Sequence, residues 1–377
     1  VTDYTFEYDD ANKQFISKVI GPQTEAGRRV EDLTHNRAGK PVRQIVNGRT
    51  DLEVAYDTGA RAEIRTNARG FRTRVVSNEF EQVVRIEHPD GAVEQMAYSP
   101  LHLQQTEAVD ALGVRTLFEH DARGNLVRKV EAAGLPEQRV TTYQLNARGQ
   151  AERITREGRT EANGVVTPDA TWQITWDERG QISQTIDPEG HVRRYEFDRI
   201  GSLRRHTDPL GRVRLYEVDA AGRLVKETDE IGLVRSLSRD KVGNLIAETD
   251  GRGKTVTQSH DALNRLVERT NAVGGVRRTQ HNGMGLVVSD TDEDGRQRLR
   301  EHDAFQRLVR LTDGLGHVTL SSYQVADGSA SGLLGSLGQP TQIAHPTYTE
   351  LRRFDARERL TSRSLVYRHA QGERSST

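Results

Sequence analysis

Residues 208–232 read "DPLGRVRLYEVDAAGRLVKETDEIG", and the phrase D-x-x-G that opens this stretch returns at residues 229–232. Phrases of this kind recur along the second half of the chain, and the glycine that ends each one follows the previous one by 21 residues. A fixed period of this length is typical of a repeat array, in which one supersecondary unit stacks on the next. The seven glycines are Gly190, Gly211, Gly232, Gly253, Gly274, Gly295 and Gly316.

Each repeat contains a second turn phrase ten or eleven residues after the glycine, such as "DAAG" at 219–222. Asp, Asn, Gly and Pro favour tight reversals of the chain. The segments of about seven residues between the turns suit strands and are too short for stable helices. Dividing 377 residues by 21 gives about 18 repeats and about 36 strands. The sequence therefore predicts an all-β protein, built as a continuous antiparallel meander of β-hairpins.

The second strand of each repeat begins with an aliphatic residue and carries a threonine four residues later. Because side chains alternate between the two faces of a strand, this even spacing predicts that both lie on one face, as a thin apolar stripe. The leucines are Leu203, Leu224, Leu245, Leu266 and Leu308, and the threonines are Thr207, Thr228, Thr249, Thr270, Thr291 and Thr312.

The first strand carries arginines at the repeat period, for example Arg193 and Arg214, with acidic neighbours such as Glu196, Glu217 and Glu227. A face that mixes charged side chains in this way is not a dry core face. We expect a cross-strand ion-pair lattice that keeps a thin sheet soluble and ordered.

The repeats divide the chain into four stretches of one continuous domain. Residues 1–165 hold irregular copies, residues 166–324 hold the regular 21-residue copies, and residues 341–377 resume the theme. Between the last two stretches, residues 325–340 form a Gly/Ser-rich insertion, which we expect to be a loop that leaves the sheet.

Composition narrows the classes of function. The 54 basic and 55 acidic residues leave a net charge of -1, so a nucleic-acid partner is not expected. The chain has no cysteine, which excludes disulfides, thiolate catalysis and cysteine-ligated zinc. No apolar run approaches the roughly 18 residues of a membrane span. The first residues show neither a signal peptide nor a starting Met, so we expect an internal piece of a longer protein.

The unit "YEVDAAGRLVKETDEIG", with an aromatic residue shortly before an Asp, then xxGRL and a T-D-x-x-G close, resembles the YD repeat of the RHS family. That family includes bacterial polymorphic toxins, the C components of insecticidal toxin complexes and the teneurins. Two copies, at 236–244 and 280–285, lack the Tyr. The segment 352–377 does not match the signature that ends the family's core, so no autoprotease residue is carried over.

The resemblance implies a sheet that coils into a hollow β-shell around a C-terminal toxin domain. Its implied partners are that toxin domain, other parts of the same RHS shell and the tip proteins of a secretion apparatus such as type VI. It also implies a secreted bacterial effector without a cleaved signal peptide. Closed into one turn, about 36 strands would form a ring ~55 Å across, wide enough for a domain of ~100 residues.

One motif competes with this structural interpretation. Asp290, Asp292, Asp294 and Glu301 satisfy the calcium-loop pattern D-x-D-x-D-G-x5-E. The flanking segments are strands rather than helices, and the same positions recur in other repeats, so a charged hairpin turn is favoured over a calcium site. A row of His260, His281 and His302 also follows the period, but equivalent strands lie ~9–10 Å apart, too far to share one zinc ion.

The sequence contains no G-x-S-x-G elbow and no phosphate loop, and most aspartates fall at turn positions. We therefore expect no cofactor and no enzyme activity within this segment. The leading hypothesis is a structural container. The alternative is an extracellular carbohydrate-binding or adhesive repeat protein, and a glycan-processing enzyme is the third possibility.

Overall fold

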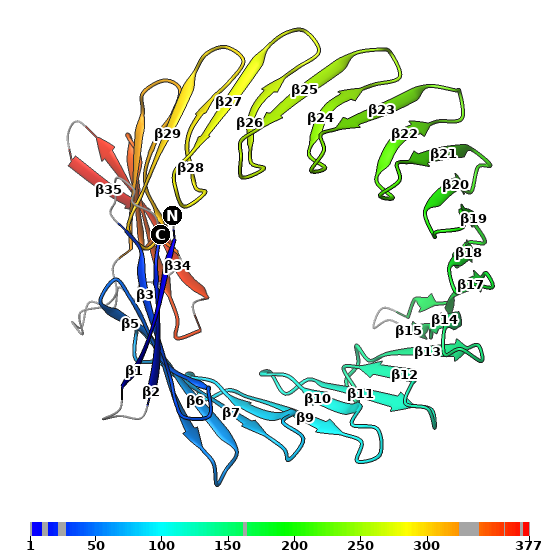
Figure 1. Cartoon of the computed structure of the whole chain (residues 1–377). Coiled ribbons are helices and arrows are strands. Elements are labelled where there is room, and N and C mark those ends of the chain that lie inside the picture. Colours follow the sequence, from blue (N-terminus) through cyan, green and yellow to red (C-terminus); the bar gives the residue numbers. More distant parts are fainter. Residues whose placement is uncertain are drawn as a thin grey trace. The chain divides into compact units, whose positions relative to one another are not determined.

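The computed structural model describes residues 2–9, 14–21, 28–160, 164–323, 339–357, 359–369 and 372–376. Every regular element in these residues is a β-strand, as predicted, and 35 strands follow one another along the chain (Figure 1). In this part of the chain we find no helix of the length and apolar character that crossing a bilayer requires.

The chain folds as two compact units. Unit 1 comprises residues 1–93, 266–268 and 275–377, and unit 2 comprises residues 94–265 and 269–274. The first strands of unit 1 are β1 (Asp3–Asp9), β2 (Gln14–Ile20), β3 (Val30–His35), β4 (Pro41–Val46), β5 (Arg49–Asp57), β6 (Ala62–Asn67), β7 (Arg72–Ser77) and β8 (Val83–Glu87). Its last strands are β27 (Val276–His281), β28 (Val287–Thr291), β29 (Gln297–His302), β30 (Leu308–Thr312), β31 (Val318–Ser322), β32 (Gln342–Ala344), β33 (Tyr348–Phe354), β34 (Leu360–His369) and β35 (Gly372–Ser376).

Unit 2 contains the middle of the array, and β26 (Leu266–Thr270) is divided between the two units. Its strands are β9 (Val93–Tyr98), β10 (Gln105–Val109), β11 (Arg115–His120), β12 (Leu126–Glu131), β13 (Arg139–Leu145), β14 (Ala151–Arg156), β15 (Arg159–Thr160), β16 (Val166–Thr167), β17 (Ala170–Trp176), β18 (Ile182–Ile186), β19 (Val192–Phe197), β20 (Leu203–Thr207), β21 (Val213–Val218), β22 (Leu224–Thr228), β23 (Val234–Arg239), β24 (Leu245–Thr249) and β25 (Thr255–His260).

Within each unit, consecutive strands pair antiparallel, which confirms the predicted meander. One hairpin leaves this ladder: β15 and β16 pair only with each other, and β14 pairs directly with β17. Most of the Gly/Ser-rich insertion lies outside the described residues. The strands on either side of it, β31 and β32, pair with each other, so the ladder continues across the insertion.

The turns share one construction, which explains the D-x-x-G phrase. At residues 208–212 the amide of Asp208 donates to the carbonyl of Arg212 at 3.0 Å, and the amide of Gly211 donates to the carbonyl of Asp208. The carboxylate oxygen Oδ1 of Asp208 accepts the amides of Leu210 and Arg212 at 2.9 and 3.0 Å. Gly211 has φ of 78°, a left-handed conformation that glycine adopts without a steric cost.

The two turns of each repeat differ in their surroundings. A turns are the turns that end in the seven periodic glycines, and B turns are the second turns of the repeats. Connections elsewhere in the chain alternate in the same way and are named accordingly, so the turn after β8 is an A turn and the turn after β9 is a B turn. In unit 2, a Cβ added at an A-turn glycine such as Gly211 meets nothing within 4 Å, whereas at the B-turn glycines Gly180 and Gly201 it meets the previous B turn at 3.1 and 3.3 Å. Gln150 and Gln181 donate to the carbonyls of these two glycines at 3.1 and 3.0 Å. The B turns of unit 2 are therefore joined in a row at these glycines. Its A turns have free space at their final glycines but approach one another elsewhere, since a Cβ added at Gly251 would lie 2.6 Å from the Leu233 side chain of the preceding A turn.

The leucines and threonines of the predicted apolar stripe lie at the first and last positions of the second strands, as in β20 and β22. A register shift beside most of the B turns of the regular repeats adds one residue to the second strand, for example where Glu196 pairs with Arg205 but Phe197 pairs with Leu203. Such a bulge interrupts strict alternation, so spacing alone does not place the leucine and the threonine on one face.

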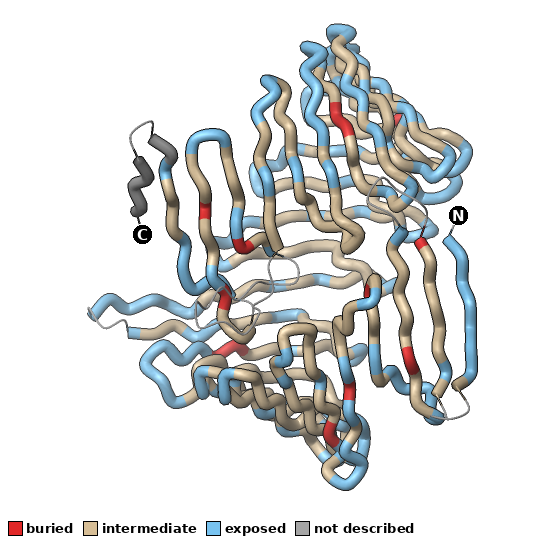
Figure 2. The backbone as a smooth tube through the Cα atoms, turned by 90° about the vertical axis from the view of Figure 1, so that its left-hand side faces the viewer, coloured by how far each residue is buried: buried red, intermediate tan, exposed pale blue. Residues whose placement is uncertain are grey.

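The core is thin. The buried apolar side chains in the described part of the chain are few, and Figure 2 shows buried residues as short isolated segments of the backbone. They are Val46, Val54, Ala62, Val130, Val140, Leu237 and Phe354. Backbone ladders and polar contacts therefore carry much of the stability that a globular domain derives from its core.

Candidate functional site

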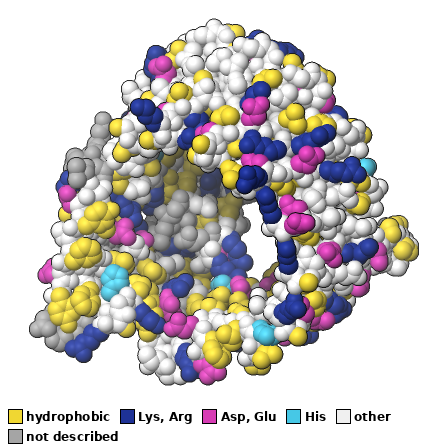
Figure 3. Space-filling model, turned by 45° about the vertical axis from the view of Figure 1, so that its right-hand side comes forward, with side chains coloured by type: hydrophobic (Ala, Val, Ile, Leu, Met, Phe, Trp, Pro, Cys, Tyr) yellow, Lys and Arg dark blue, Asp and Glu magenta, His cyan; other side chains and the backbone are white. Residues whose placement is uncertain are grey.

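The faces of the sheet carry the predicted ion-pair lattice. In unit 2 the carboxylate of Glu227 lies between Arg214 at 3.2 Å and Arg235 at 3.4 Å, and Arg235 also contacts Glu248 at 2.7 Å. Side chains of both signs are interspersed on the surface (Figure 3). Four arginines of the periodic row are thus paired with acids in the described residues, namely Arg193, Arg214, Arg235 and Arg277.

A different contact lies inside unit 1, where its first strands meet its last. Asp90, in the A turn after β8, accepts hydrogen bonds from Nε and an Nη of Arg357, at 2.9 and 2.8 Å. Arg359 reaches the other oxygen of Asp90 at 3.2 Å and also pairs with Asp355 at 2.7 Å. The Arg357 side chain is only 14% exposed, so this fork is shielded from water on one side.

Three further contacts extend the same interface. Asn47 donates to the carbonyl of Ala304 at 2.8 Å, and Arg69 donates to the carbonyl of Asp355 at 3.2 Å. A Cβ added at Gly21 would lie 3.4 Å from the terminal methyl group of Met284. In every case an A-side connection of the first strands meets a B turn of the last strands. We refer to these contacts, with the Asp90 fork, as the seam.

The two aspartates of the seam bind arginine side chains as ionised carboxylates. Burial alone would raise the pKa of Asp90, but hydrogen bonds from Arg357 and the backbone outweigh it and hold the pKa below its ordinary value. The pKa of Asp355 is lowered in the same way by Arg359. Both acids are therefore ionised at neutral pH and serve as anchors for arginine, a role that needs no proton transfer.

The four residues of the calcium pattern are separated by other partners. Asp290 is buried in β28 between Arg277 and Arg300, and Oδ1 of Asp292 accepts two amides of its own A turn. The remaining two acids, Asp294 and Glu301, face Arg296 at 3.8 Å and Arg310 at 3.6 Å. The described geometry thus assigns all four to ion pairs and turn hydrogen bonds.

The periodic histidines end their strands one residue before a B turn. His302 pairs in register with Leu308, and His281 with Val287, positions where other repeats have Phe197. Burial, with Arg300 nearby, lowers the pKa of His302. These histidines therefore stand where Phe197 stands in its own repeat. His302 is neutral at pH 7, because its pKa is lowered from an ordinary value that is already below 7.

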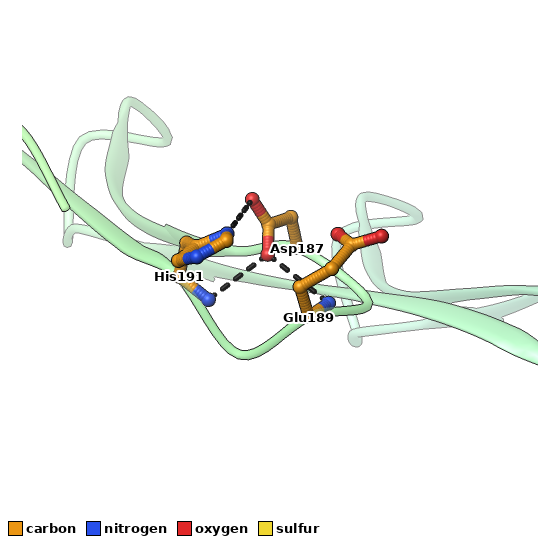
Figure 4. Close-up of side chains that lie close together, drawn as sticks. All are labelled: Asp187, Glu189 and His191. Atoms are coloured by element: carbon orange, nitrogen blue, oxygen red, sulfur yellow. Dashed lines mark hydrogen bonds and ion pairs between the residues drawn. The ribbon is translucent and has the colours of Figure 1, made fainter.

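Asp187, Glu189 and His191, which sequence reasoning did not single out, lie on the A turn between β18 and β19. Their potential ligand atoms all lie within 4.8 Å of one another (Figure 4). Oδ1 of Asp187 already accepts the amides of the other two residues, and Oδ2 lies 3.1 Å from Nδ1 of His191 and 3.5 Å from an Nη of Arg193.

The Asp–His arrangement recurs in another A turn, six repeats further along the chain, where the glutamate is missing. Asp313 and His317 repeat the contacts of Asp187 and His191, at 2.9 and 3.0 Å, with Leu315 in the place of the glutamate. The Asp–His pair is therefore part of the turn construction and does not by itself indicate a metal.

The first strands also form a groove. One face of β1 to β7 lines a hollow of about 920 Å³ that contains both acids and bases, including Glu7, Asp32, Lys18 and Arg43. Lys18 and Asp32 pair across it at 3.6 Å. Its lining mixes charged and polar side chains with apolar ones such as Ile16 and Val54.

Comparisons with known proteins agree with this architecture. A family model described as RHS Repeat matches residues 239–276. The resemblance to the RHS/YD-repeat family is confirmed. Two solved structures share the fold over 94% of the chain, each at 12% sequence identity and a TM-score of 0.56: TcdB2-TccC3, and TcdB2-TccC3 without its hypervariable C-terminal region.

The chain spans about a quarter of the solved chains it matches, 23% and 22% of their lengths. A search of curated proteins finds no match. At this identity the structural likeness establishes the RHS-repeat fold.

Proposed function

We propose that the chain is a structural segment of the RHS-repeat shell of a secreted bacterial toxin, and that the shell encloses a C-terminal toxin domain. The observation that carries this proposal is the seam, in which turns of the first strands are bound to turns of the last. A wall of hairpins encloses a volume only if its successive rows are joined, and the seam joins two rows through polar and ionic contacts.

The chemistry of the sheet supports the same role. The acids of the seam and of the calcium pattern are paired with arginines or accept turn amides, so no catalytic function is proposed for them. The groove on β1 to β7 offers paired charges of both signs, which suits many weak contacts with an extended cargo. We propose the toxin domain and other parts of the same shell as partners, and a secretion apparatus as the route of delivery.

Limited proteolysis of the native gene product, followed by mass spectrometry, tests the proposal. We expect a toxin segment that resists protease in the wild type and becomes digestible when Asp90→Arg opens the seam by placing like charges together. The matched control is Asp294→Arg, an acid-to-arginine change on an A turn whose side chain is 75% exposed. A toxin segment digested equally fast in the wild type and in isolation would overturn the container.

One observation favours the second candidate, a carbohydrate-binding surface. Tyr4, Phe6 and Tyr8 alternate on one face of β1 and are 65%, 82% and 45% exposed, and the ring of Phe15 lies tilted beside that of Tyr8 with centroids 4.8 Å apart. Exposed aromatic rings can stack on sugar faces. Glycan-array binding that Phe6→Ser abolishes would favour this candidate, and a flat response over the array would remove it.

A further inference from the structure

The seam shows which part of a turn makes contact between rows. In three B turns of the last strands of unit 1 the third residue contacts the first strands: Met284 lies against Gly21, Phe305 stacks under the guanidinium of Arg49 at 4.3 Å, and Arg357 binds Asp90. None of these three B-turn residues is among the exposed residues of the chain.

The equivalent residues of three B turns in unit 2 are exposed and aliphatic, whereas three others are arginines that donate to a carbonyl of the next B turn, namely Arg123, Arg148 and Arg179. Ile200, Val242 and Leu263, third in their B turns, are 73%, 71% and 68% exposed. The A turns of unit 2 show the same pattern at their third residues. These are Leu112, Leu210, Ile231 and Val273, with exposed fractions of 88%, 78%, 74% and 85%.

Aliphatic side chains at the tips of consecutive turns form a line of apolar points, because equivalent turns along a meander follow each other at ~9–10 Å. A line of exposed apolar side chains is more often part of an interaction surface than part of an ordinary solvent-facing edge. The charges at the turn tips also differ between the two rows. The second and third residues of the B turns of unit 2 include five bases and one acid, and those of its A turns include two acids and one base. The B-turn residues are Arg123, Arg148, Arg179, Arg199 and Lys241 with Glu178, and the A-turn residues are Glu189 and Glu230 with Arg252.

We propose that the B-turn tips of unit 2 dock onto a row of A-turn tips of the same repeat type. In a solution of this chain alone, a second copy supplies that row. The seam provides the precedent, since its contacts join A-side connections to B turns and its ionic fork joins an acidic A tip to a basic B tip. This inference deepens the proposed shell by naming what its free rows bind, and it rests on that proposal only for its biological setting.

The geometry of such docking is head to tail, because the two surfaces that meet are different. Head-to-tail contacts do not close on themselves unless a rotation brings the ends together, so they produce open assemblies that grow with concentration. A contact of a few aliphatic tips is small, so we expect weak association, between about 1 and 100 µM.

Sedimentation velocity on the whole chain tests the proposal. We expect the sedimentation coefficient of the wild type to rise with concentration, and the B-tip variant Ile200→Ser/Val242→Ser/Leu263→Ser to stay monomeric. The matched control replaces the second residues of three B turns in the same row with serine, as Ala122→Ser/Ala220→Ser/Ala262→Ser, and should associate like the wild type. Since the substituted side chains are exposed, circular dichroism should show the same fold for every variant.

A mixing experiment tests the direction of docking. An A-tip variant, Leu210→Ser/Ile231→Ser/Val273→Ser, keeps an intact B row, and the B-tip variant keeps an intact A row. Each should be monomeric alone, and an equimolar mixture should form a dimer and nothing larger. A wild type that stays monomeric up to about 100 µM, a B-tip variant that associates like the wild type, or a mixture that forms no dimer would overturn the proposal. None of these outcomes depends on a cargo, so the container and the docking rows fail separately.

Discussion

Asp290 offers the sharpest test of whether paired charges support this fold. Its side chain is 9% exposed, and its Oδ2 accepts hydrogen bonds from Arg277 at 3.0 Å and Arg300 at 3.3 Å. Burial alone would raise the pKa of Asp290, but the two arginines outweigh burial and hold the pKa below its ordinary value. Arg277 and Arg300 remain 45% and 24% exposed, so the acid is the partner that has lost its water.

Because the acid is buried and the arginines are partly exposed, we expect replacement of the arginines and replacement of the aspartate to lower the free energy of unfolding by different amounts. Arg277→Met/Arg300→Met leaves a buried carboxylate without a cation, and we expect it to lower the free energy of unfolding by about 3 kcal/mol at pH 7. Asp290→Asn keeps an acceptor oxygen and leaves two arginines that can turn to water. We expect that change to cost about 1 kcal/mol.

The pH dependence has a definite sign. In the wild type the depressed pKa of Asp290 contributes stability that is complete above the ordinary pKa of 3.8 and is lost as the pH falls through the folded value. In the double methionine variant, burial without arginines raises the pKa of Asp290. The variant's deficit relative to the wild type should therefore shrink as the pH falls from 7 toward 4, because its carboxylate takes up a proton.

Urea unfolding of the three proteins at pH 7 and at pH 4 measures both effects. Equal destabilisation by Asp290→Asn and by the double methionine variant would refute the reasoning. A calcium arm separates the ion pair from the metal motif: about 1 mM calcium should leave the melting temperature of the wild type unchanged. A calcium-dependent rise that Asp290→Asn abolishes would show that the carboxylate binds the metal instead of the arginines.

Three further outcomes follow from single residues. The hydrogen bond from Arg265 lowers the pKa of Asp261 to about 2, so the carboxylate should still be ionised at pH 3, while the stability it gives this turn is complete above the ordinary pKa of 3.8 and is lost as the pH falls from there through about 2; a carboxyl titration by NMR with a midpoint near 4 would contradict it. Glu81 has φ of 61° at a position where most turns have glycine, so Glu81→Gly should raise the unfolding free energy by about 1 kcal/mol while Glu79→Gly in the same turn lowers it, as measured by urea unfolding. Phe354 is 2% exposed, so Phe354→Ala should cost about 3–5 kcal/mol, against less than about 0.5 kcal/mol for Phe80→Ala at a site that is 53% exposed, and equal melting temperatures for the two variants would contradict the burial argument.

The turns were predictable because one local rule places them. The phrase D-x-x-G contains its own acceptor and its own left-handed residue, so each turn is specified within five residues of sequence. The period even locates turns that lack the glycine. Asn264 and Gln306 stand at that position with φ of 62° and 67°, which the surrounding hairpin imposes at the cost of some strain.

The seam was not predictable for the opposite reason. Asp90 and Arg357 are 267 residues apart, and both are ordinary turn residues whose local sequence gives no sign of a distant partner. Their pairing depends on how many hairpins lie between them and on the twist that each one adds. The register shifts beside the B turns contribute to that twist, and a bulge leaves no signature in an apolar/polar pattern that it interrupts by one residue.

The seam also changes how an array of this kind can come apart. In a linear array each repeat contacts only its neighbours, so the terminal repeats fray at low cost and unfolding proceeds inward. Here the first and last strands belong to one unit, and both ends of unit 2 are covalently joined to it. Fraying that proceeds inward from the first strands must break the contact of Asn47 with Ala304, and further opening must break those of Arg69 and Asp90 with the B turn after β33. The thin core is supplemented there by contacts between elements far apart in the sequence, so opening inward from either side becomes more costly at the seam.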